Sequence, residues 1–340
     1  MSSILTISKN GTLKRADNSL VFIKKETNDK IKIPINKISQ LEIYSNVILD
    51  SEVLYFLNIN NIGINFYQHY SQSKFGEYNM WNKRGSEKVM INQFKAYLNN
   101  RNKYIYEFYK GIINNILFLL AKYQTRPIIG KQITCIISEI KNNLKELENG
   151  ISFESYLLFE AKIWKKFYES IDLINTKDDF VFEKRSRRPP LNYMNALISF
   201  LNTKLYFLTN SLIKQTKLDN RIGFVHELTD EGRFSLALDI SELFKPFFVF
   251  YFIFYNINKN VITISDFEKK DFRLTDIGLN KINKLFQQFI ETSFFYPDLK
   301  RNISYQYLIK IESYKLIKSF YNIKEFKAIN FNELDFNVKK

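Results

Sequence analysis

The spacing of apolar residues changes once along this chain, near residue 87, and this change limits the possible folds more than any other feature. From Ile4 to about Tyr78 the segments are short, rich in β-branched and aromatic residues and interrupted by turn residues, which is typical of strands. After about Glu87 the apolar residues recur at the helical period, and they do so to about Phe320. The sequence therefore predicts an α+β protein, with a small N-terminal β-sheet domain followed by a larger all-α domain.

Turn residues and polar stretches indicate where these domains begin and end. We place the β-sheet domain at residues 1–78, a polar linker at 79–87, the helical domain at 88–325 and a polar, frayed tail at 326–340. In the first domain Asn10-Gly11 predicts a hairpin turn, residues 51–60 have helical spacing and residues 63–67 resume a strand. The amphipathic stretches of the second domain are 88–123, 131–148, 152–172, 190–217, 233–256 and 275–295.

Composition limits the class of protein. The 340 residues are 45% apolar, which is enough to build a core, and they carry a net charge of +15. Such a charge is expected of a protein that meets nucleic acid or an anionic membrane surface. The chain is also rich in Asn, Ile, Phe and Tyr beside Lys, a bias that an AT-rich genome would impose. The charge alone therefore does not decide between nucleic-acid binding and a merely solvated surface.

Cysteine usage and apolar runs indicate the compartment. Cys135 is the only cysteine, so neither a disulfide within the chain nor a zinc site built on cysteines can form. The first ten residues lack a basic segment followed by an apolar stretch, and the longest apolar run, Phe247–Tyr255, is about half the length of a membrane span. We therefore expect a soluble cytoplasmic protein with no membrane partner.

Glu160 interrupts the apolar stripe of its predicted helix. The other members of that stripe are Phe153, Leu157, Trp164, Phe167 and Ile171. A buried carboxylate tends to become neutral unless a cation or a metal ion holds it ionised. Glu160 is therefore either a ligand or an ordinary residue at the edge of the stripe, where glutamate is common.

His226 is one of two histidines in the chain. It follows Gly223 in a predicted turn and precedes a helix, a place from which an imidazole can be offered to a site, although a single histidine is more often structural. His69 lies among polar residues at the end of the β-sheet domain, and we expect it on the surface.

Asp239 and Glu242 are three residues apart on a predicted helix, so their side chains share a face. Two acids this close repel each other, and a divalent cation would relieve the repulsion. Carboxylates with one imidazole form the mixed oxygen and nitrogen set that suits Mg²⁺ or Mn²⁺ in phosphodiester chemistry. The alternative is an ordinary acidic helix face.

A basic cluster precedes a pair of prolines that can open the next helix. Its members are Lys184, Arg185, Arg187 and Arg188. Arginine suits phosphate contacts because its guanidinium is a rigid fork of donors. The segment is either a DNA contact or a solvated loop.

Together these segments resemble the CRISPR-associated integrase family, the larger of the two universal adaptation proteins. The residues that carry the resemblance are Leu157–Trp164, with the family's active-site glutamate at Glu160; Arg187–Pro190 followed by Asn195–Leu197; Gly223–His226; Leu236–Pro246, with acids at Asp239 and Glu242; and the late helix Leu308–Ile317. Their order and spacing both fit, and with the opening Asn10-Gly11 the resemblance covers nearly the whole chain.

A few positions depart from the family pattern without removing a ligand. Ala161 stands where the family often has Gly, and Lys245 stands where it often has Arg. Glu242 stands where some members carry Asp, which leaves open whether Asp239 or Glu242 coordinates the metal. We take Glu242 as the third ligand, because family members have either acid at that position.

The resemblance implies a metal-dependent DNA endonuclease and integrase that inserts new spacer DNA into the CRISPR array. Glu160, His226 and Glu242 would bind Mg²⁺ or Mn²⁺ in the helical, catalytic domain, and Asp239 would orient a group or accept a proton. A 3′-hydroxyl of the incoming double-stranded DNA would attack a phosphodiester at the repeat boundary. Lys184, Arg185, Arg187 and Arg188 would contact backbone phosphates.

The resemblance also implies partners. The protein would form a homodimer largely through its β-sheet domains, and a small ferredoxin-like CRISPR-associated adaptation protein would bridge two such dimers. Its DNA partners would be the incoming spacer DNA and the CRISPR repeat.

Two other functions remain open from the residues. A stand-alone structure-specific nuclease that cuts branched DNA would use the same metal site. A non-catalytic nucleic-acid-binding scaffold would leave the acids and the histidine structural, which requires three unusual features to coincide by chance in the order of a known active site.

Overall fold

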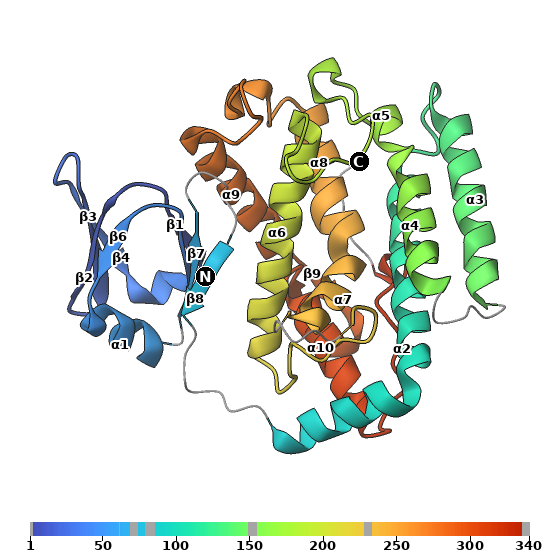
Figure 1. Ribbon diagram of the computed structural model, residues 1–340, viewed down its shortest axis with the longest axis horizontal. Coiled ribbons are helices and arrows are strands. Elements are labelled where there is room, and N and C mark those ends of the chain that lie inside the picture. The colour runs from blue at the N-terminus through green and yellow to red at the C-terminus, as the bar shows by residue number, and fades with distance from the viewer. Residues whose placement is uncertain are drawn as a thin grey trace. The chain divides into compact units, whose positions relative to one another are not determined.

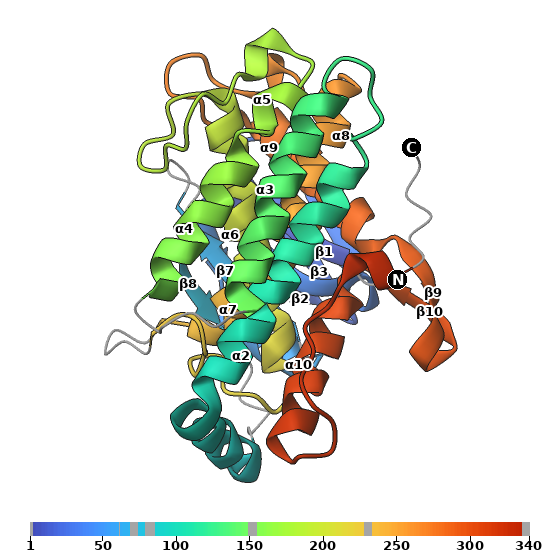
Figure 2. The same cartoon turned by 90° about the vertical axis from the view of Figure 1, so that its right-hand side faces the viewer.

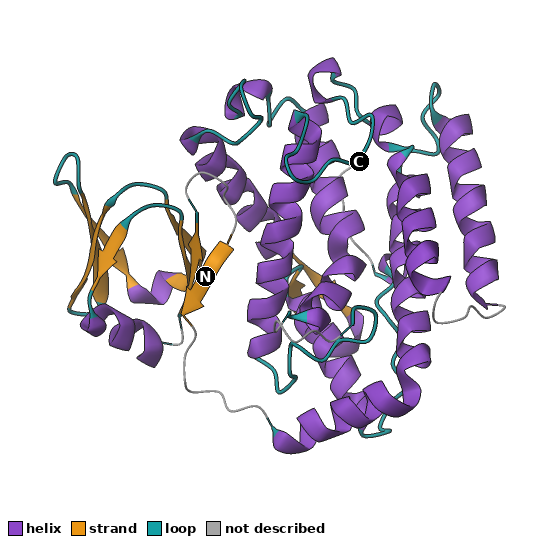
Figure 3. Ribbon diagram, viewed as in Figure 1, coloured by secondary structure: helices purple, strands orange, loops and turns teal. Residues whose placement is uncertain are grey.

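The structure is a computed structural model that describes residues 3–60, 62–68, 74–78, 86–148, 155–227 and 233–334. The chain divides into two compact units: residues up to 84 together with 273–288 form the first, and the remaining residues form the second. Strands dominate the first unit and helices the second (Figures 1 and 3). The predicted α+β class is confirmed.

The first unit contains two four-stranded sheets that share one core. The sheet β1-β5-β7-β8 consists of Ser3–Ile7, Ile38–Ile43, Gly63–Tyr67 and Lys74–Tyr78, and the sheet β4-β3-β2-β6 consists of Lys30–Pro34, Ser19–Lys24, Gly11–Ala16 and Val47–Leu49. Helix α1 (Ser51–Ile59) begins after Asp50, whose side chain accepts a hydrogen bond from the backbone N–H of Val53 (2.9 Å). Both sheets and α1 supply residues to the apolar core, among them Leu13, Leu41 and Phe56.

The hairpin predicted at Asn10-Gly11 is wrong. Strand β1 pairs in parallel with β5 in one sheet, whereas β2 begins at Gly11 in the other. A Cβ at Gly11 would lie 2.3 Å from the carbonyl oxygen of Ile23. Glycine is needed here for a close backbone approach where the chain passes between sheets. The hairpins of that second sheet join β2 to β3 at Asp17 and β3 to β4 at Asn28, whose φ values of 53° and 56° are in the left-handed region.

The second unit is built on the long helix α2 (Glu87–Ala121). It bends at Asn100, whose backbone is not helical (φ −135°, ψ 18°). Helices α3 and α4 lie beside it (Figure 2). The α-helices that the structure describes after α2 in this unit are Gly130–Glu148 (α3), Ser155–Tyr168 (α4), Ile171–Ile174 (α5), Tyr193–Lys214 (α6), Ser235–Phe244 (α7), Phe252–Asn258 (α8) and Tyr307–Phe320 (α10).

The longest apolar run of the sequence forms the centre of this unit. Between α7 and α8 the chain winds as a π-helix, Lys245–Tyr251. The largest fully buried side chains of residues 244–254 are Phe244, Phe247, Phe248, Phe250, Phe252 and Phe254. Within the part of the chain that the structure describes, no helix is long and apolar enough to cross a membrane.

The structure corrects the predicted second domain in two places. It is not all helical, because Ser293–Tyr296 (β9) and Arg301–Ser304 (β10) form an antiparallel pair. Most of helix α9 (Asp276–Glu291) groups with the N-terminal strands: Asn280 exchanges hydrogen bonds with Ser8, and Lys9 pairs with Asp276 (2.7 Å). Amphipathic spacing predicts such a helix but not which core it covers.

The predicted frayed tail is wrong for residues 326–334. Phe326, Ile329 and Phe331 are buried in the second unit, although their segment has no regular apolar spacing that would mark it as a packed element. Residues 335–340, residues 79–85 of the predicted linker and His69 lie outside the described residues.

We predict that Gly11→Ala lowers the free energy of unfolding by about 1–3 kcal/mol, because the added methyl group meets the Ile23 carbonyl and the Phe22 ring. Urea unfolding followed by circular dichroism measures the change. Gly76→Ala is the matched control, since its methyl group would find ordinary contact at 3.9 Å from the Phe66 ring. Equal stability of the two variants would contradict the close approach.

Candidate active site

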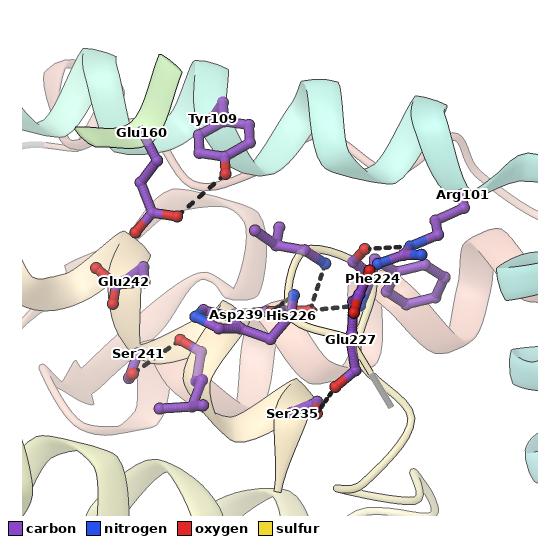
Figure 4. Close-up of polar contacts among 12 residues, drawn as sticks. Arg101, Tyr109, Glu160, Phe224, His226, Glu227, Ser235, Asp239, Ser241 and Glu242 are labelled. Carbon is purple, nitrogen blue, oxygen red and sulfur yellow. Dashed lines mark hydrogen bonds and ion pairs between the residues drawn. The ribbon is translucent and has the colours of Figure 1, made fainter. Parts of the chain in front are cut away.

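Four segments of the second unit bring polar side chains to one place (Figure 4). Glu160 comes from α4, His226 from the loop that follows α6, and Asp239 and Glu242 from α7. Helix α2 adds Tyr109. The residues singled out in the sequence therefore meet, although α4 and α7 are far apart in the chain. Asp239 and Glu242 are both buried, as their shared helix face packs inward.

Asp239 holds the loop that carries His226. Its Oδ2 accepts hydrogen bonds from the backbone N–H groups of Phe224 and Val225, and its Oδ1 accepts one from the backbone N–H of His226 (3.0 Å). The same Oδ1 lies 2.8 Å from Nδ1 of the His226 ring. Both carboxylate oxygens are thus engaged by the loop, and the ring is fixed with its Nε2 as the remaining nitrogen.

The surroundings of His226 favour its protonated form. Burial by itself lowers the pKa of the imidazole, but the hydrogen bond and charge of Asp239, with the charges of Glu242 and Glu160, raise that pKa above its usual value. Gly223 is required in the same loop, because a Cβ there would lie 2.7 Å from Oδ2 of Asp239.

Helix α2 fixes the other side of this loop. Gln93 donates from Nε2 to the carbonyl oxygens of Asp219 (2.8 Å) and Ile222 (2.7 Å), and its Oε1 accepts from the backbone N–H of Asp219 (3.0 Å). Arg101 donates from Nε to the carbonyl oxygen of Phe224 (2.7 Å). The loop is therefore held between α2 and α7 by hydrogen bonds to its backbone.

Glu160 points from α4 towards Glu242, and the hydroxyl of Tyr109 donates to its Oε2 (3.1 Å) (Figure 4). Burial raises the pKa of Glu160, and the negative charge of Glu242 raises it further, while His226 and Lys245 act in the opposite direction. Burial and the charge of Glu160 also raise the pKa of Tyr109, so that its hydroxyl stays protonated as a donor.

Only one of the two carboxylate oxygens of Glu242 has a polar partner in the described chain. Its Oε1 forms an ion pair with Lys245, three residues later, where the π-helix begins. Its Oε2 is buried and has no hydrogen-bond partner within the described chain. A buried carboxylate oxygen without a donor is costly, so this atom is the one most readily offered to a cation.

No group of three or more His, Cys, Asp or Glu side chains stands ready to hold a metal ion among the described residues. Asp239 is taken up by the loop, and Lys245 occupies one oxygen of Glu242. The predicted ligand set of Glu160, His226 and Glu242 stays a prediction. The geometry favours Glu242 over Asp239 as the third ligand, because only Glu242 keeps an oxygen without a partner.

In the basic cluster, one side chain is bonded within the protein and three are exposed to solvent. Arg185 donates from its guanidinium to Oδ1 of Asn195 (2.9 Å) and Oγ of Ser199 (2.9 Å), so it joins the loop to α6. Its predicted phosphate contact stays a prediction, and the half-buried guanidinium already serves these bonds inside the protein. Lys184, Arg187 and Arg188 are exposed.

Sequence reasoning missed the residues that support the site from α2. Gln93 lies on the buried face of the helix between Val89 and Ala96, and this polar residue in an apolar stripe was a readable signal of the same kind as Glu160. Tyr109 gave no such signal, since a tyrosine in an apolar stripe is normally part of the core.

The family model described as "CRISPR associated protein Cas1" matches residues 5–288 of this chain. The CRISPR-associated endonuclease Cas1 2 of Thermodesulfovibrio yellowstonii is 33% identical over 332 residues, which is 96% of this chain and 98% of that protein.

Solved structures agree with this assignment. A CAS1 protein from Thermotoga maritima is 28% identical, with a TM-score of 0.83 over 97% of this chain and 100% of that one. A casposase bound to integration product shares the fold at 17% identity, with a TM-score of 0.82 over 100% and 96% of the two chains. The protein described here therefore belongs to the family of CRISPR-associated Cas1 proteins.

Proposed function

We propose that this protein is a metal-dependent DNA endonuclease and integrase that inserts new spacer DNA into a CRISPR array. One observation carries the proposal: in a member of the Cas1 family, Glu160, His226 and Glu242 come from three separate segments and share one largely buried site. Burial and the charge of Glu242 raise the pKa of Glu160, and a carboxyl group perturbed in this way is typical of functional sites.

The residues of the site fit a divalent cation. Oε2 of Glu242 is buried without a partner in the described chain, and the charge of Glu242 raises the pKa of Glu160. A cation between the two carboxylates would remove both costs. Carboxylate oxygens with one imidazole nitrogen are a set that suits Mg²⁺ or Mn²⁺. Lys245 supplies the positive charge in the structure as it stands, so it would have to release Glu242.

Each protein group then has a distinct role. Glu160 and Glu242 would hold the ion through oxygen and His226 through Nε2, while Asp239 keeps the imidazole in place through Nδ1. When bound, the ion would polarise the phosphodiester and stabilise the charge that develops on it. Tyr109 fixes the orientation of Glu160 by donating to its Oε2.

The proposed reaction is a transesterification. The 3′-hydroxyl of the incoming DNA loses its proton and its oxygen forms a bond to phosphorus at the repeat boundary. The bond from phosphorus to the 3′-oxygen of the cut strand breaks, and that oxygen takes up a proton. The number of phosphodiester bonds is unchanged. Water in place of the hydroxyl gives hydrolysis, which is the endonuclease activity.

DNA and protein partners complete the proposal. The exposed Lys184, Arg187 and Arg188 would contact backbone phosphates, in keeping with a chain of net charge +15. A homodimer formed through the strand-rich unit, and a small ferredoxin-like CRISPR-associated protein that bridges two dimers, are proposed on the family resemblance alone.

An integration assay tests the function. The protein is incubated with its small partner, short DNA that carries free 3′-hydroxyls, a plasmid with a repeat array and Mn²⁺, and joined products are expected on a gel. Cutting of branched DNA without joining would favour a stand-alone nuclease. Binding with neither cutting nor joining would favour a scaffold.

We predict that Glu160→Ala and His226→Ala each reduce joining by at least about a hundredfold, because each removes a ligand from a metal worth several kcal/mol of transition-state stabilisation. DNA affinity, measured by fluorescence anisotropy, stays near wild type. Glu146→Ala is the matched control, since that glutamate is exposed and pairs only with Lys162 among the described contacts. Preserved joining in either variant would refute the site.

We predict effects of different size for the two acids of α7. Asp239→Asn lowers the free energy of unfolding by about 3 kcal/mol in the absence of metal, because it replaces an acceptor of backbone N–H bonds with a donor. Glu242→Gln leaves it within about 1 kcal/mol of wild type, because the repulsion of Glu160 that is removed offsets the ion pair with Lys245 that is lost. Thermal unfolding in EDTA measures both, and the reverse ranking would make Asp239 the better ligand candidate.

We predict that Arg187→Ala combined with Arg188→Ala weakens DNA binding and lowers the slope of log affinity against log salt by about two, because each arginine would otherwise neutralise one backbone phosphate. Anisotropy titrations over a range of salt concentrations measure the slope. Lys131→Ala combined with Lys145→Ala removes the same charge from exposed positions on α3. An equal change in both pairs would show a general charge effect.

A further inference from the structure

Asn115 on α2 is fully buried and uses its whole amide group to join two segments. Its Nδ2 donates to the carbonyl oxygen of Leu243 (2.9 Å), the residue after Glu242, and to that of Ile329 (3.2 Å). Its Oδ1 accepts from the backbone N–H of Phe331 (2.9 Å). The amide therefore ties the end of α7 to the segment that was expected to be a frayed tail.

We call residues 325–334 the C-terminal strap. It runs beside α2 and α10 (Figure 2). The backbone N–H of Ile329 donates to Oε2 of the buried Glu312 on α10 (3.0 Å), and the backbone N–H of Ala328 donates to Glu107 on α2 (3.3 Å). The strap is thus fixed to two helices, so Asn115 joins α7 to a rigid support.

Gly111 allows the strap and α7 to approach across α2. A Cβ at this glycine would lie 2.7 Å from the Cβ of Ala328 and 2.7 Å from Cδ2 of Leu243. Gly111 lies one helical turn before Asn115, so the same three segments meet twice: once by close packing and once by hydrogen bonds.

The end of α7 needs such external support. Pro246 has no N–H, so the carbonyl of Glu242 lacks the partner that an α-helix would supply from that position. The helix also widens into the π-helix at Lys245. The local backbone therefore holds Glu242 less firmly than the middle of a regular helix would.

We propose that Asn115 and the C-terminal strap form a clamp that sets the position of Glu242, and with it the affinity of the site for a divalent ion. Asn115 is a positioning residue that acts through the backbone of Leu243. The inference rests on the proposed function, since it takes Glu242 as a ligand.

Direct Mn²⁺ binding tests the clamp. Free Mn²⁺ is measured by electron paramagnetic resonance at a temperature where circular dichroism shows every variant folded. Asn115→Ala is expected to weaken binding about tenfold or more, the range typical of residues that orient a ligand. Asn256→Ala is the matched control, because it removes another buried asparagine, whose Nδ2 donates to the carbonyl of Phe252 (2.8 Å), without touching α7 or the strap in any described contact.

A second pair of variants keeps the test decisive if Asn115→Ala does not fold. Gly111→Ala adds a methyl group that displaces Ala328 and Leu243, and it is expected to weaken Mn²⁺ binding. Adding Ala328→Gly to that variant removes the contact with Ala328, so that only the flexible end of the Leu243 side chain has to move, and should recover part of the affinity. Rescue of this kind would not follow from a general loss of stability.

The outcomes separate the clamp from the proposed function. Wild-type affinity in folded Asn115→Ala, or in Gly111→Ala, would overturn the clamp while Glu242→Gln still weakens binding and supports the site. Undiminished binding in Glu242→Gln, or no Mn²⁺ binding by the wild type, would overturn the proposed site and the clamp together.

Discussion

Hydrogen bonds from the buried face of helix α2 are the constraint on which the site depends. Gln93 and Arg101 hold the histidine loop, Tyr109 holds the carboxylate of α4, and Asn115 holds the end of α7. Buried polar bonds of this kind are directional and costly to leave unmade. One helix therefore places three segments that have no local sequence relation to one another.

The acids of the site differ because of their surroundings. Asp239 is saturated by backbone N–H groups and the imidazole of His226, whereas Glu242 shares one oxygen with Lys245 and leaves the other without a partner in the described chain. Like charges in a buried place are unfavourable for folding, and the same arrangement favours a cation. In the proposed function, the repulsion between Glu160 and Glu242 lowers the stability of the empty site and favours the binding of a divalent cation.

Local patterns were informative where a residue departed from the apolar spacing of its segment. Glu160 was found because it occupies an apolar position, and the change of spacing near residue 87 predicted the succession of strands and helices. Patterns predicted the wrong environment where the same residue type occurs in two kinds of structural position. Asn10-Gly11 is a frequent turn, but here the glycine allows two backbones to approach closely. Arg185 looked like its basic neighbours and turned out to bind α6.

The sequence by itself determined the α+β class, the order of the elements and the chemical types gathered in the site, because periodicity and composition are properties of neighbouring residues. The tertiary structure decided which acid is saturated and which keeps an oxygen without a partner in the described chain, and it decided that residues 325–334 pack as the C-terminal strap. Those outcomes depend on bonds such as that from Gln93 to the carbonyl of Asp219, which lie 126 positions apart. No local pattern encodes a partner at that separation, because the two residues meet only when the helices have packed.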